Sequence, residues 1–515
     1  MSMVVQHNMQ AANANRMLGI TSGAQAKSTE KLSSGYKINR AADDAAGLTI
    51  SEKMRKQIRG LDKASSNAQD GVSSVQTAEG ALTEVHSMLQ RMNELAVQAA
   101  NGTNSKDTDR KAIQDEIDQL NTEIDRVAET TKFNEIYLLK GDDGEKTVNM
   151  KAHDAGLKGT MTDNGDGTAT FTMAALNDGD TVSIGGKNYT IGSSKADADK
   201  LVVAPGAGEP DKKLTIGDKT FVLKAGDTKV YDETGTNQVF VKTADGSAGA
   251  TAFSTGAELT TTSQFKNDQN TATNNTAVTI DNLKDYIKGG VKVSDGTTTL
   301  TVLKDATGAA GNDGVDDNDN SLITKKKAYE LAAKELLAAN QIGDTEGSAK
   351  VGVGNVGTAV SLTNGTGTFQ IQTGSAKVAN TLSFSLHVGA DADMTNKITV
   401  DIDTMNSANL GIKGLNVTDK NGSAATYAID AISDAISKVS SQRSALGAVQ
   451  NRLEHTIDNL DNISENTSSA ESRIRDTDMA KEMVNYSKNN ILAQAGQSML
   501  AQANQSNQGV LSLLQ

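Results

Sequence analysis

The first residues that could do chemistry form a glycine motif. Gly352 to Gly357 has the spacing GxGxxG, which in dinucleotide-binding folds opens a helix whose free N–H groups bind a pyrophosphate. Here Thr358 to Leu362 continues with a strand pattern, and Asn364-Gly365 is a turn signal, so no helix is expected at the loop. Glycine is frequent throughout this region. We therefore interpret the match as chance and expect no cofactor.

Two acidic segments could hold a metal ion. Asp163 to Gly167 resembles a calcium loop, and Asp313 to Asn320 is a cluster of carboxylates. Neither has carboxylates at the first, third and fifth positions with Gly at the sixth and Glu at the twelfth. We predict hairpin turns at the first segment, a solvated loop at the second, and no metal site.

The remaining reactive residues form no catalytic set. The five histidines are scattered, cysteine is absent, and HExxH does not occur. A Gly-x-Ser-x-Gly elbow or a phosphate loop framed by a strand and a helix is also absent. The sequence therefore predicts a protein that is not an enzyme.

Composition narrows the class of protein further. The 515 residues carry a formal net charge of −14, which opposes sequence-independent binding to nucleic acid. No run of about 18 apolar residues occurs, so we expect no membrane insertion. No basic-then-apolar segment opens the chain, so we expect no cleavable signal peptide.

Both flanks of the chain have the pattern of long helices. Apolar residues recur at alternating steps of mostly three and four over 72–99, 113–127 and 429–463, which puts a narrow stripe on one face of each helix. A turn signal, Asn101-Gly102-Thr103-Asn104, separates the first two helices. We expect an antiparallel bundle with an aliphatic seam.

The extreme ends carry almost no charge. Residues 1–15 have at most a charge on His7, and 489–515 have none, yet both contain many helix formers. Disordered tails are usually charged or rich in proline. Identical faces in an array, by contrast, avoid charge because each charge would meet its own copy. We therefore favour helices that become ordered on self-assembly. The spaced apolar residues that assembly would bury are Ile491, Leu492, Met499, Leu500, Val510, Leu511 and Leu514.

The middle of the chain has the pattern of β structure. Residues 143–380 contain both prolines and most of the 47 glycines, which interrupt helices. Tight turns flanked by short strands are predicted within 182–191, 214–223 and 291–303, and their recurrence suggests a repeated hairpin module. We also expect short helices at 281–288 and 325–340 and a hairpin that joins 382–388 to 398–402. The predicted fold class is α+β and multidomain: a long antiparallel coiled-coil helical bundle formed by paired N- and C-terminal segments, with a β-rich insert.

One helix face lies beside the apolar stripe. Leu89, Met92 and Leu95 partly join the stripe, whereas Gln90, Arg91 and Glu94 point away from it. A solvated helix face is one interpretation. A contact surface is the other, because Arg among amide and apolar groups is typical of interface anchors.

Several long motifs resemble the bacterial flagellin family. The N-terminal motifs are SSGYKINRAADDAAGL at 33–48, LQRMNELAVQAANGTNS at 89–105 and KFNEIYLL at 132–139. The C-terminal motifs are RSALGAVQNRLEHTIDNL at 443–460, SRIRDTDMA at 472–480 and ILAQAGQSMLAQANQ at 491–505. The resemblance covers about 3–142 and 381–515, and 143–380 matches only as the variable insert of the family.

The resemblance implies three regions. Residues 1–45 with 473–515 would form terminal helices of the filament inner core that are disordered in the monomer. Residues 46–142 with 381–472 would form a helical bundle with a β-hairpin, the outer wall of the core. Residues 143–380 would form a variable surface-exposed insert of one or two subdomains.

The resemblance also implies partners and a location. Copies of the chain would polymerise into a helical filament for motility, outside the cell, after export by the flagellar type III route. The export chaperone of the family would bind near 480–515, over the C-terminal apolar residues named above. Hook-associated and cap proteins are further expected partners.

Many members of the family are recognised by the innate immune Toll-like receptor 5. The receptor-binding motif of the family matches Gln90, Arg91, Leu95 and Glu116 here, with Glu94 beside them. The match departs at Leu120, where many members carry a basic residue, and this departure would weaken one edge of the contact.

Two other functions fit parts of the sequence. The insert could be a catalytic or ligand-binding module, for example for adhesion to glycans or host surfaces. Helix hairpins alone would also suit a cytosolic coiled-coil signalling protein, although the glycine-rich insert and the neutral ends oppose that function.

Overall fold

The computed structural model describes residues 8–103, 105, 108–242, 258–261, 276–304, 313–352, 367–419 and 422–513. The chain divides into two compact units. The first comprises 1–79, 383–401 and 443–515, and the second comprises 80–382 and 402–442. Two long helices, α2 (Ala45–Ala100) and α9 (Ser423–Arg475), contribute residues to both.

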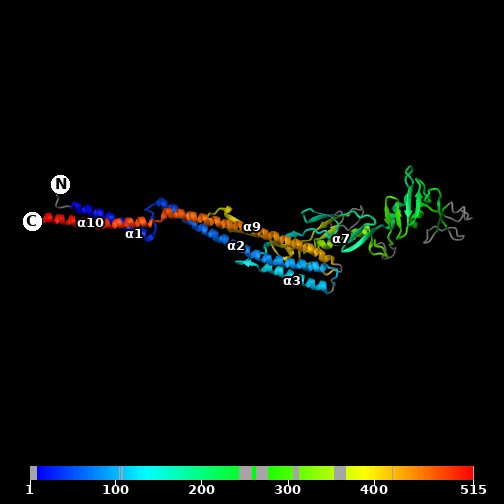
Figure 1. Ribbon diagram of the computed structural model, residues 1–515, viewed down its shortest axis with the longest axis horizontal. Helices are drawn as coiled ribbons and strands as arrows, with labels where there is room; N and C mark the ends of the chain where they lie inside the picture. The colour runs from blue at the N-terminus through cyan, green and yellow to red at the C-terminus, as the bar shows by residue number, and fades with distance from the viewer. Residues whose placement is uncertain are drawn as a thin grey trace. The chain divides into compact units, whose positions relative to one another are not determined.

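In the first unit, the two terminal helices lie side by side. α1 (Met9–Ser34) begins after Asn8, whose side-chain oxygen accepts a hydrogen bond from the N–H of Ala11. α10 (Met479–Leu513) runs antiparallel to it (Figure 1). At one end Asn8 Nδ2 donates to the carbonyl of Ala503 at 3.1 Å, and at the other the N–H of Thr477 donates to the carbonyl of Gly35 at 2.9 Å.

A β-hairpin packs against α2 and α9 in the first unit. β20 (Leu382–His387) pairs with β21 (Lys397–Ile402), and the short helix η1 (Met394–Asn396) precedes the second strand. This confirms the hairpin predicted for 382–388 and 398–402. The apolar core between hairpin and helices comprises Leu61, Ala64, Ala68, Val388, Ile398, Leu453 and Leu460.

In the second unit, α2 ends at the predicted turn and α3 (Asp109–Thr130) follows. Each predicted helix lies within a longer one, because the flanking residues contain no proline and the glycines before the α2 stripe, Gly47, Gly60 and Gly71, are isolated ones that a helix tolerates. The predicted stripe is buried on α2, where Leu82, Leu89 and Met92 are fully covered. Within the described part, every helix falls short of the length and apolarity that a membrane span requires.

One part of the insert is built around α7 (Lys325–Asn340), where a helix was predicted. Two sheets contribute to its apolar core, with the strand orders β17-β18-β5-β4 and β16-β7-β6. We call this core, together with Tyr427 of α9, the α7 core. The strands are β4 (Gly159–Asp163), β5 (Thr168–Met173), β6 (Thr181–Ile184), β7 (Lys187–Gly192), β16 (Leu322–Thr324), β17 (Lys350–Gly352) and β18 (Thr368–Gln372).

A second part of the insert has its own core, which we call the α6 core. A five-stranded antiparallel sheet of order β10-β9-β8-β14-β15 packs with α4 (Lys195–Leu201) and α6 (Ile280–Tyr286). The helix predicted to continue to 288 ends at Tyr286, since Ile287 is extended. The strands are β8 (Lys212–Ile216), β9 (Lys219–Leu223), β10 (Val230–Tyr231), β14 (Lys292–Ser294) and β15 (Thr299–Thr301).

The three predicted hairpins are present, but they do not form one repeated array. The hairpins at 214–223 and 291–303 join in the five-stranded sheet through β8 and β14, whereas the hairpin at 182–191 belongs to the α7 core. The remaining elements are β1 (Lys132–Phe133), β2 (Ile136–Tyr137), β3 (Asp142–Asn149), β11 (Val239–Lys242), β12 (Glu258–Thr261), β13 (Thr276–Ala277), β19 (Ser375–Asn380) and α8 (Ser407–Leu410).

Candidate interaction surfaces

The first candidate surface joins α2 to α3 through an arginine. Arg91 Nε donates to Oε1 of Glu116 at 2.9 Å, and its Nη1 donates to Oε2 of Glu94 at 3.1 Å. The two hydrogen bonds, first that to Glu116 and then that to Glu94, raise the pKa of Arg91 above its usual value. All three side chains are largely exposed. The structure therefore brings together three of the predicted receptor-binding residues as a fixed, solvent-facing cluster.

The other two predicted residues lie differently. Gln90 is exposed beside the cluster, where its Nε2 lies 3.1 Å from Nε2 of His86. Leu95 is only 2% exposed and belongs to the buried stripe with Leu89 and Met92. A partner on this surface would therefore touch the polar residues, while Leu95 supports them from beneath. Leu120 on α3 is half-buried.

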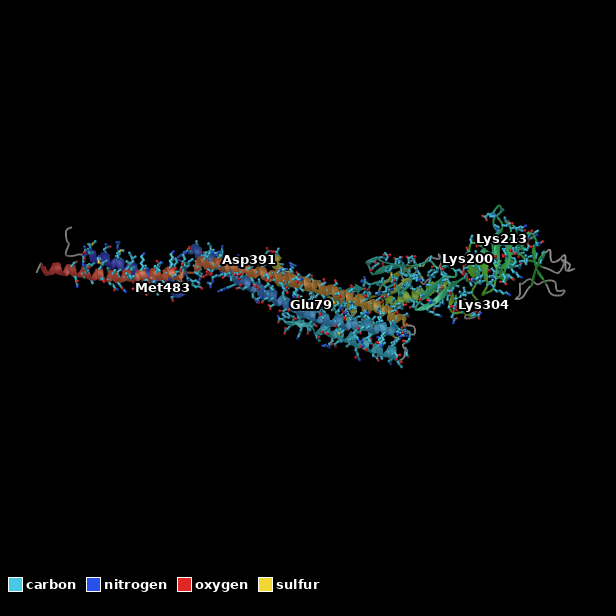
Figure 2. The ribbon with its side chains drawn as sticks, viewed as in Figure 1. Glu79, Lys200, Lys213, Lys304, Asp391 and Met483 are labelled. Atoms are coloured by element: carbon cyan, nitrogen blue, oxygen red, sulfur yellow. The ribbon has the colours of Figure 1, made fainter. Side chains whose placement is uncertain are left out.

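The second candidate surface is the apolar side of the terminal helices. Only Ser28 of α1 is buried, and no described side chain of α10 is. The Ser28 hydroxyl donates a hydrogen bond to the carboxylate of Glu482, and this bond lowers the pKa of Glu482. The exposed apolar residues are Met9, Met17 and Ile20 on α1, and Met479, Met483, Val484, Ile491, Leu492 and Met499 on α10 (Met483 is labelled in Figure 2).

The predicted assembly residues fall on this surface where their side chains are described. Ile491, Leu492 and Met499 are exposed, and Leu500 is half-buried. Val510 and Leu511 lie on α10, but their side chains are outside the described part, and Leu514 is outside it altogether. Met483, Val484, Ser487, Lys488, Ile491 and Leu492 line a shallow depression of about 500 Å³.

The sequence analysis missed the residues of α1 that share this surface. Met9, Met17 and Ile20 are spaced by steps that return to one side of a helix, and residues 1–15 have at most a charge on His7. The absence of charge drew attention to residues 1–15 as well as to 489–515, but Met17 and Ile20 lie beyond Arg16, and only their spacing would have indicated them.

The acidic side chains of both candidate metal-binding segments accept backbone hydrogen bonds in turns. Asp163 and Asp166 accept the N–H groups of Gly165 and Thr168 in the β4–β5 hairpin, which confirms the predicted turn. Asp316 accepts the N–H groups of Lys304, Asn318 and Asp319. Among the described residues, no cluster of three His, Cys, Asp or Glu side chains could hold a metal ion. Gly352 ends β17, and the rest of the glycine motif, 353–357, lies outside the described residues.

Comparisons with known proteins cover both flanks and the insert. The chain matches the bacterial flagellin N-terminal helical region over residues 5–143 and the C-terminal helical region over 429–514. A flagellin of Clostridium tyrobutyricum is 37% identical over 509 residues, which is 98% of this chain and 100% of that protein. Polar flagellin A of Vibrio parahaemolyticus is 33% identical over the full length of both chains.

The chain belongs to the bacterial flagellin family. As a flagellin it is a structural protein and not an enzyme, and it is a subunit of the flagellar filament that assembles with copies of itself. The six flagellin motifs quoted from the sequence all lie inside the two matched regions. None of them lies in the insert, 143–380. A solved structure of FliC from Burkholderia pseudomallei matches over 74% of this chain and 99% of that chain at 17% identity, with a TM-score of 0.26.

Proposed function

We propose that residues 1–45 and 473–515 build the filament by becoming ordered against copies of themselves. The observation that carries this proposal is the exposure of apolar side chains on both α1 and α10. Two helices that bury almost nothing between them are only marginally stable alone, because the burial of an apolar face supplies most helical stability. Contacts with neighbouring copies would cover these faces and order the helices.

The geometry of assembly follows from unlike contacts. A face of α10 that packs on a different face of the next copy forms a heterologous contact, which continues as a helix when the rotation does not close. Residues 46–142 with 381–472 would then form the outer wall of the core, and 143–380 the exposed insert. In this proposal, the chain travels by the type III route to an extracellular filament, and a chaperone covers the α10 face before assembly. Hook-associated and cap proteins would bind the ends of the polymer.

Truncation tests the assembly proposal. Full-length protein and versions that lack 1–45 or 473–515 are purified as monomers, seeded with filament fragments, and followed by light scattering and electron microscopy. Only the full chain should elongate, while circular dichroism of both truncations should retain the helices and strands of the remainder. Elongation of either truncation at the rate of the full chain would reject the proposal.

We further propose that the cluster of Arg91, Glu94 and Glu116, with Gln90, binds Toll-like receptor 5. Support comes from the family motif and from the way both carboxylates hold the guanidinium in one orientation, which reduces the entropy lost on binding. Arg91→Ala should weaken receptor binding by at least about tenfold, as is typical of an interface anchor. Arg126→Ala, which breaks the exposed pair with Glu123 on α3, is the matched control and should leave binding unchanged. Equal binding by R91A and the parent chain would refute this surface.

A further inference from the structure

The five-stranded sheet of the insert has two unlike faces. One face contributes Leu214, Ile216, Phe221, Leu223 and Val293 to the α6 core. Since side chains alternate along a strand, the intervening residues lie on the opposite face. That face, which we call the hydroxyl face, carries Ser, Thr and Lys side chains on the strands β8, β14 and β15.

Four hydroxyl side chains form one row across the hydroxyl face. Thr215 of β8 is the register partner of Thr220 on β9 and of Ser294 on β14, and Ser294 is the partner of Thr299 on β15. The hydroxyls of Thr215 and Thr220 lie 3.1 Å apart, and those of Ser294 and Thr299 lie 2.9 Å apart. At about 4.8 Å between strands the row extends roughly 14 Å.

A lysine lies on each side of this row. Lys213 is two residues before Thr215, and Lys292 is two residues before Ser294. Because β8 and β14 are antiparallel, the two lysines flank the row from opposite sides. Both side chains are exposed, and neither forms an ion pair with any residue in the described part of the chain (Lys213 is labelled in Figure 2).

The sheet is locally basic although the chain is acidic. The strands of this sheet contain four lysines, of which Lys213 and Lys292 lie on the hydroxyl face, and no carboxylate, in a chain whose net charge is −14. The β8–β9 and β14–β15 turns contain one carboxylate each: Asp218 in the first turn is exposed, and Asp295 in the second accepts the N–H groups of Thr297 and Thr298 and lies 3.5 Å from Lys212. The two flanking ammonium groups are therefore left for an outside anion.

We propose that the hydroxyl face binds an anionic polysaccharide, a function that goes beyond that of a filament subunit. Each hydroxyl can both donate and accept, as the ring hydroxyls of a sugar require, and the two ammonium groups can pair with sulfate or carboxylate substituents. An apolar partner does not fit, because Val222, the large aliphatic residue of this face, is 4% exposed and lies beside the turn at Gly235. The hydroxyls and lysines of this face are therefore complementary to a polysaccharide whose sugar units carry both hydroxyl groups and negative charges.

The test uses the full-length chain and heparin as the anionic probe, with uncharged dextran beside it. The parent chain should bind heparin and not dextran, and its affinity should fall as salt is added. Lys213→Gln with Lys292→Gln should weaken heparin binding by about fivefold or more. Lys200→Gln with Lys304→Gln, both labelled in Figure 2, is the control of equal charge change. It should alter binding by less than about twofold.

A second variant separates sugar recognition from simple charge attraction. Thr215→Val with Ser294→Ala keeps the charge and removes two hydroxyls of the row, and it should also weaken heparin binding while circular dichroism stays that of the parent chain. Equal loss in both lysine variants, full binding by the hydroxyl variant, or equal affinity for duplex DNA and heparin would each overturn the proposal.

Discussion

Arg110 Nη1 donates a hydrogen bond to the backbone carbonyl of Asp419 at 2.8 Å, although the two residues are 309 positions apart. Its Nε donates to the carbonyl of Ala99 at 2.8 Å and its Nη2 to that of Asn101 at 3.3 Å. The side chain is 1% exposed. One guanidinium therefore joins the end of α2, the start of α3 and the segment that leads into α9.

Replacement of Arg110 should destabilise this junction strongly. Arg110→Ala leaves three carbonyls without their hydrogen-bond donor and a cavity in place of a large side chain. We therefore expect the free energy of unfolding to fall by about 3 kcal/mol or more. Arg110→Lys should restore only part of this stability, because an ammonium group cannot reproduce the planar, forked donor geometry of a guanidinium.

Urea denaturation of the full chain measures the Arg110 effect. Lys111→Ala, at the exposed neighbouring position, is the control and should change the midpoint little. An unchanged midpoint for Arg110→Ala would contradict the role assigned to the guanidinium.

Two glycines of α2 should respond oppositely to alanine. A Cβ at Gly60 would lie 2.9 Å from Cβ and 3.1 Å from Cα of Ala390 in the β20–β21 loop, whereas a Cβ at Gly80 would meet no described atom within 4 Å. Gly80→Ala should stabilise by about 0.5–1 kcal/mol through helix propensity. Gly60→Ala should lose that gain to steric overlap and destabilise by about 1 kcal/mol.

The glycine pair is its own matched control, since both substitutions add one methyl group to the same helix. Thermal unfolding followed by circular dichroism is sufficient to compare them. Equal stabilisation by both would mean that the hairpin does not approach α2 as closely as the structure places it.

Acid should loosen the β14–β15 hairpin through Asp295. Burial alone would raise the pKa of this carboxyl, but hydrogen bonds from Thr298 and Thr297 and the nearby Lys212 ammonium outweigh burial and lower the pKa to about 2. The unfolded chain has a pKa of about 3.9 at this position. The stabilisation, roughly 2 kcal/mol, is therefore complete above pH about 4 and is lost as pH falls through about 2.

Hydrogen exchange of the β14 and β15 amides, corrected for the intrinsic rate at each pH, measures this loss. Asp295→Asn should show weaker protection than the parent chain above about pH 4, and the difference should vanish as pH falls to about 2. Asp218→Asn, in the β8–β9 turn, should follow the parent chain. A parent chain whose protection does not change between pH 5 and pH 2 would disprove the assignment.

A charge placed on the α10 surface should stop filament growth without unfolding the monomer. Ile491 is 66% exposed in the single chain, so Ile491→Asp removes little internal contact. In a filament that covers this face, each copy would have to bury an unpaired carboxylate, and the critical concentration should rise by at least about tenfold. Sedimentation of seeded polymer measures this concentration.

Val203→Asp is the control for that variant, because Val203 is 54% exposed in the insert. It should polymerise like the parent chain. Normal growth of Ile491→Asp would show that the α10 face stays open in the polymer.

Local pattern was sufficient for the helices and hairpins. The α7 helix occupies 325–340 as predicted, and the hairpin turn at Asp163 to Gly167 uses the two glycines at positive φ. These features depend on residues within one turn of helix or one tight loop, so the chain itself specifies them. The exposed position of Arg91 and Glu94 followed from the same periodicity.

Which strands pair across long stretches of the chain could not be predicted from the sequence. β5 lies beside β18, so that Phe171 faces Phe369 across the sheet, and the parallel contact of β16 with β7 has no local signal. The burial of Leu95 and the inclusion of Tyr427 in the α7 core are of the same kind, because each depends on which segment packs above it.

The sequence alone determined the long helices, the β-rich insert, the neutral ends and the family to which the chain belongs. Periodicity, turn residues and charge are properties of neighbouring positions, so they can be identified without the tertiary structure. The tertiary structure decided where Arg110 is enclosed, which carboxylates hold Arg91, and how Thr215 and Ser294 come into one row. Those relations join residues far apart in the chain, and only the packing of complete elements brings them within hydrogen-bonding distance.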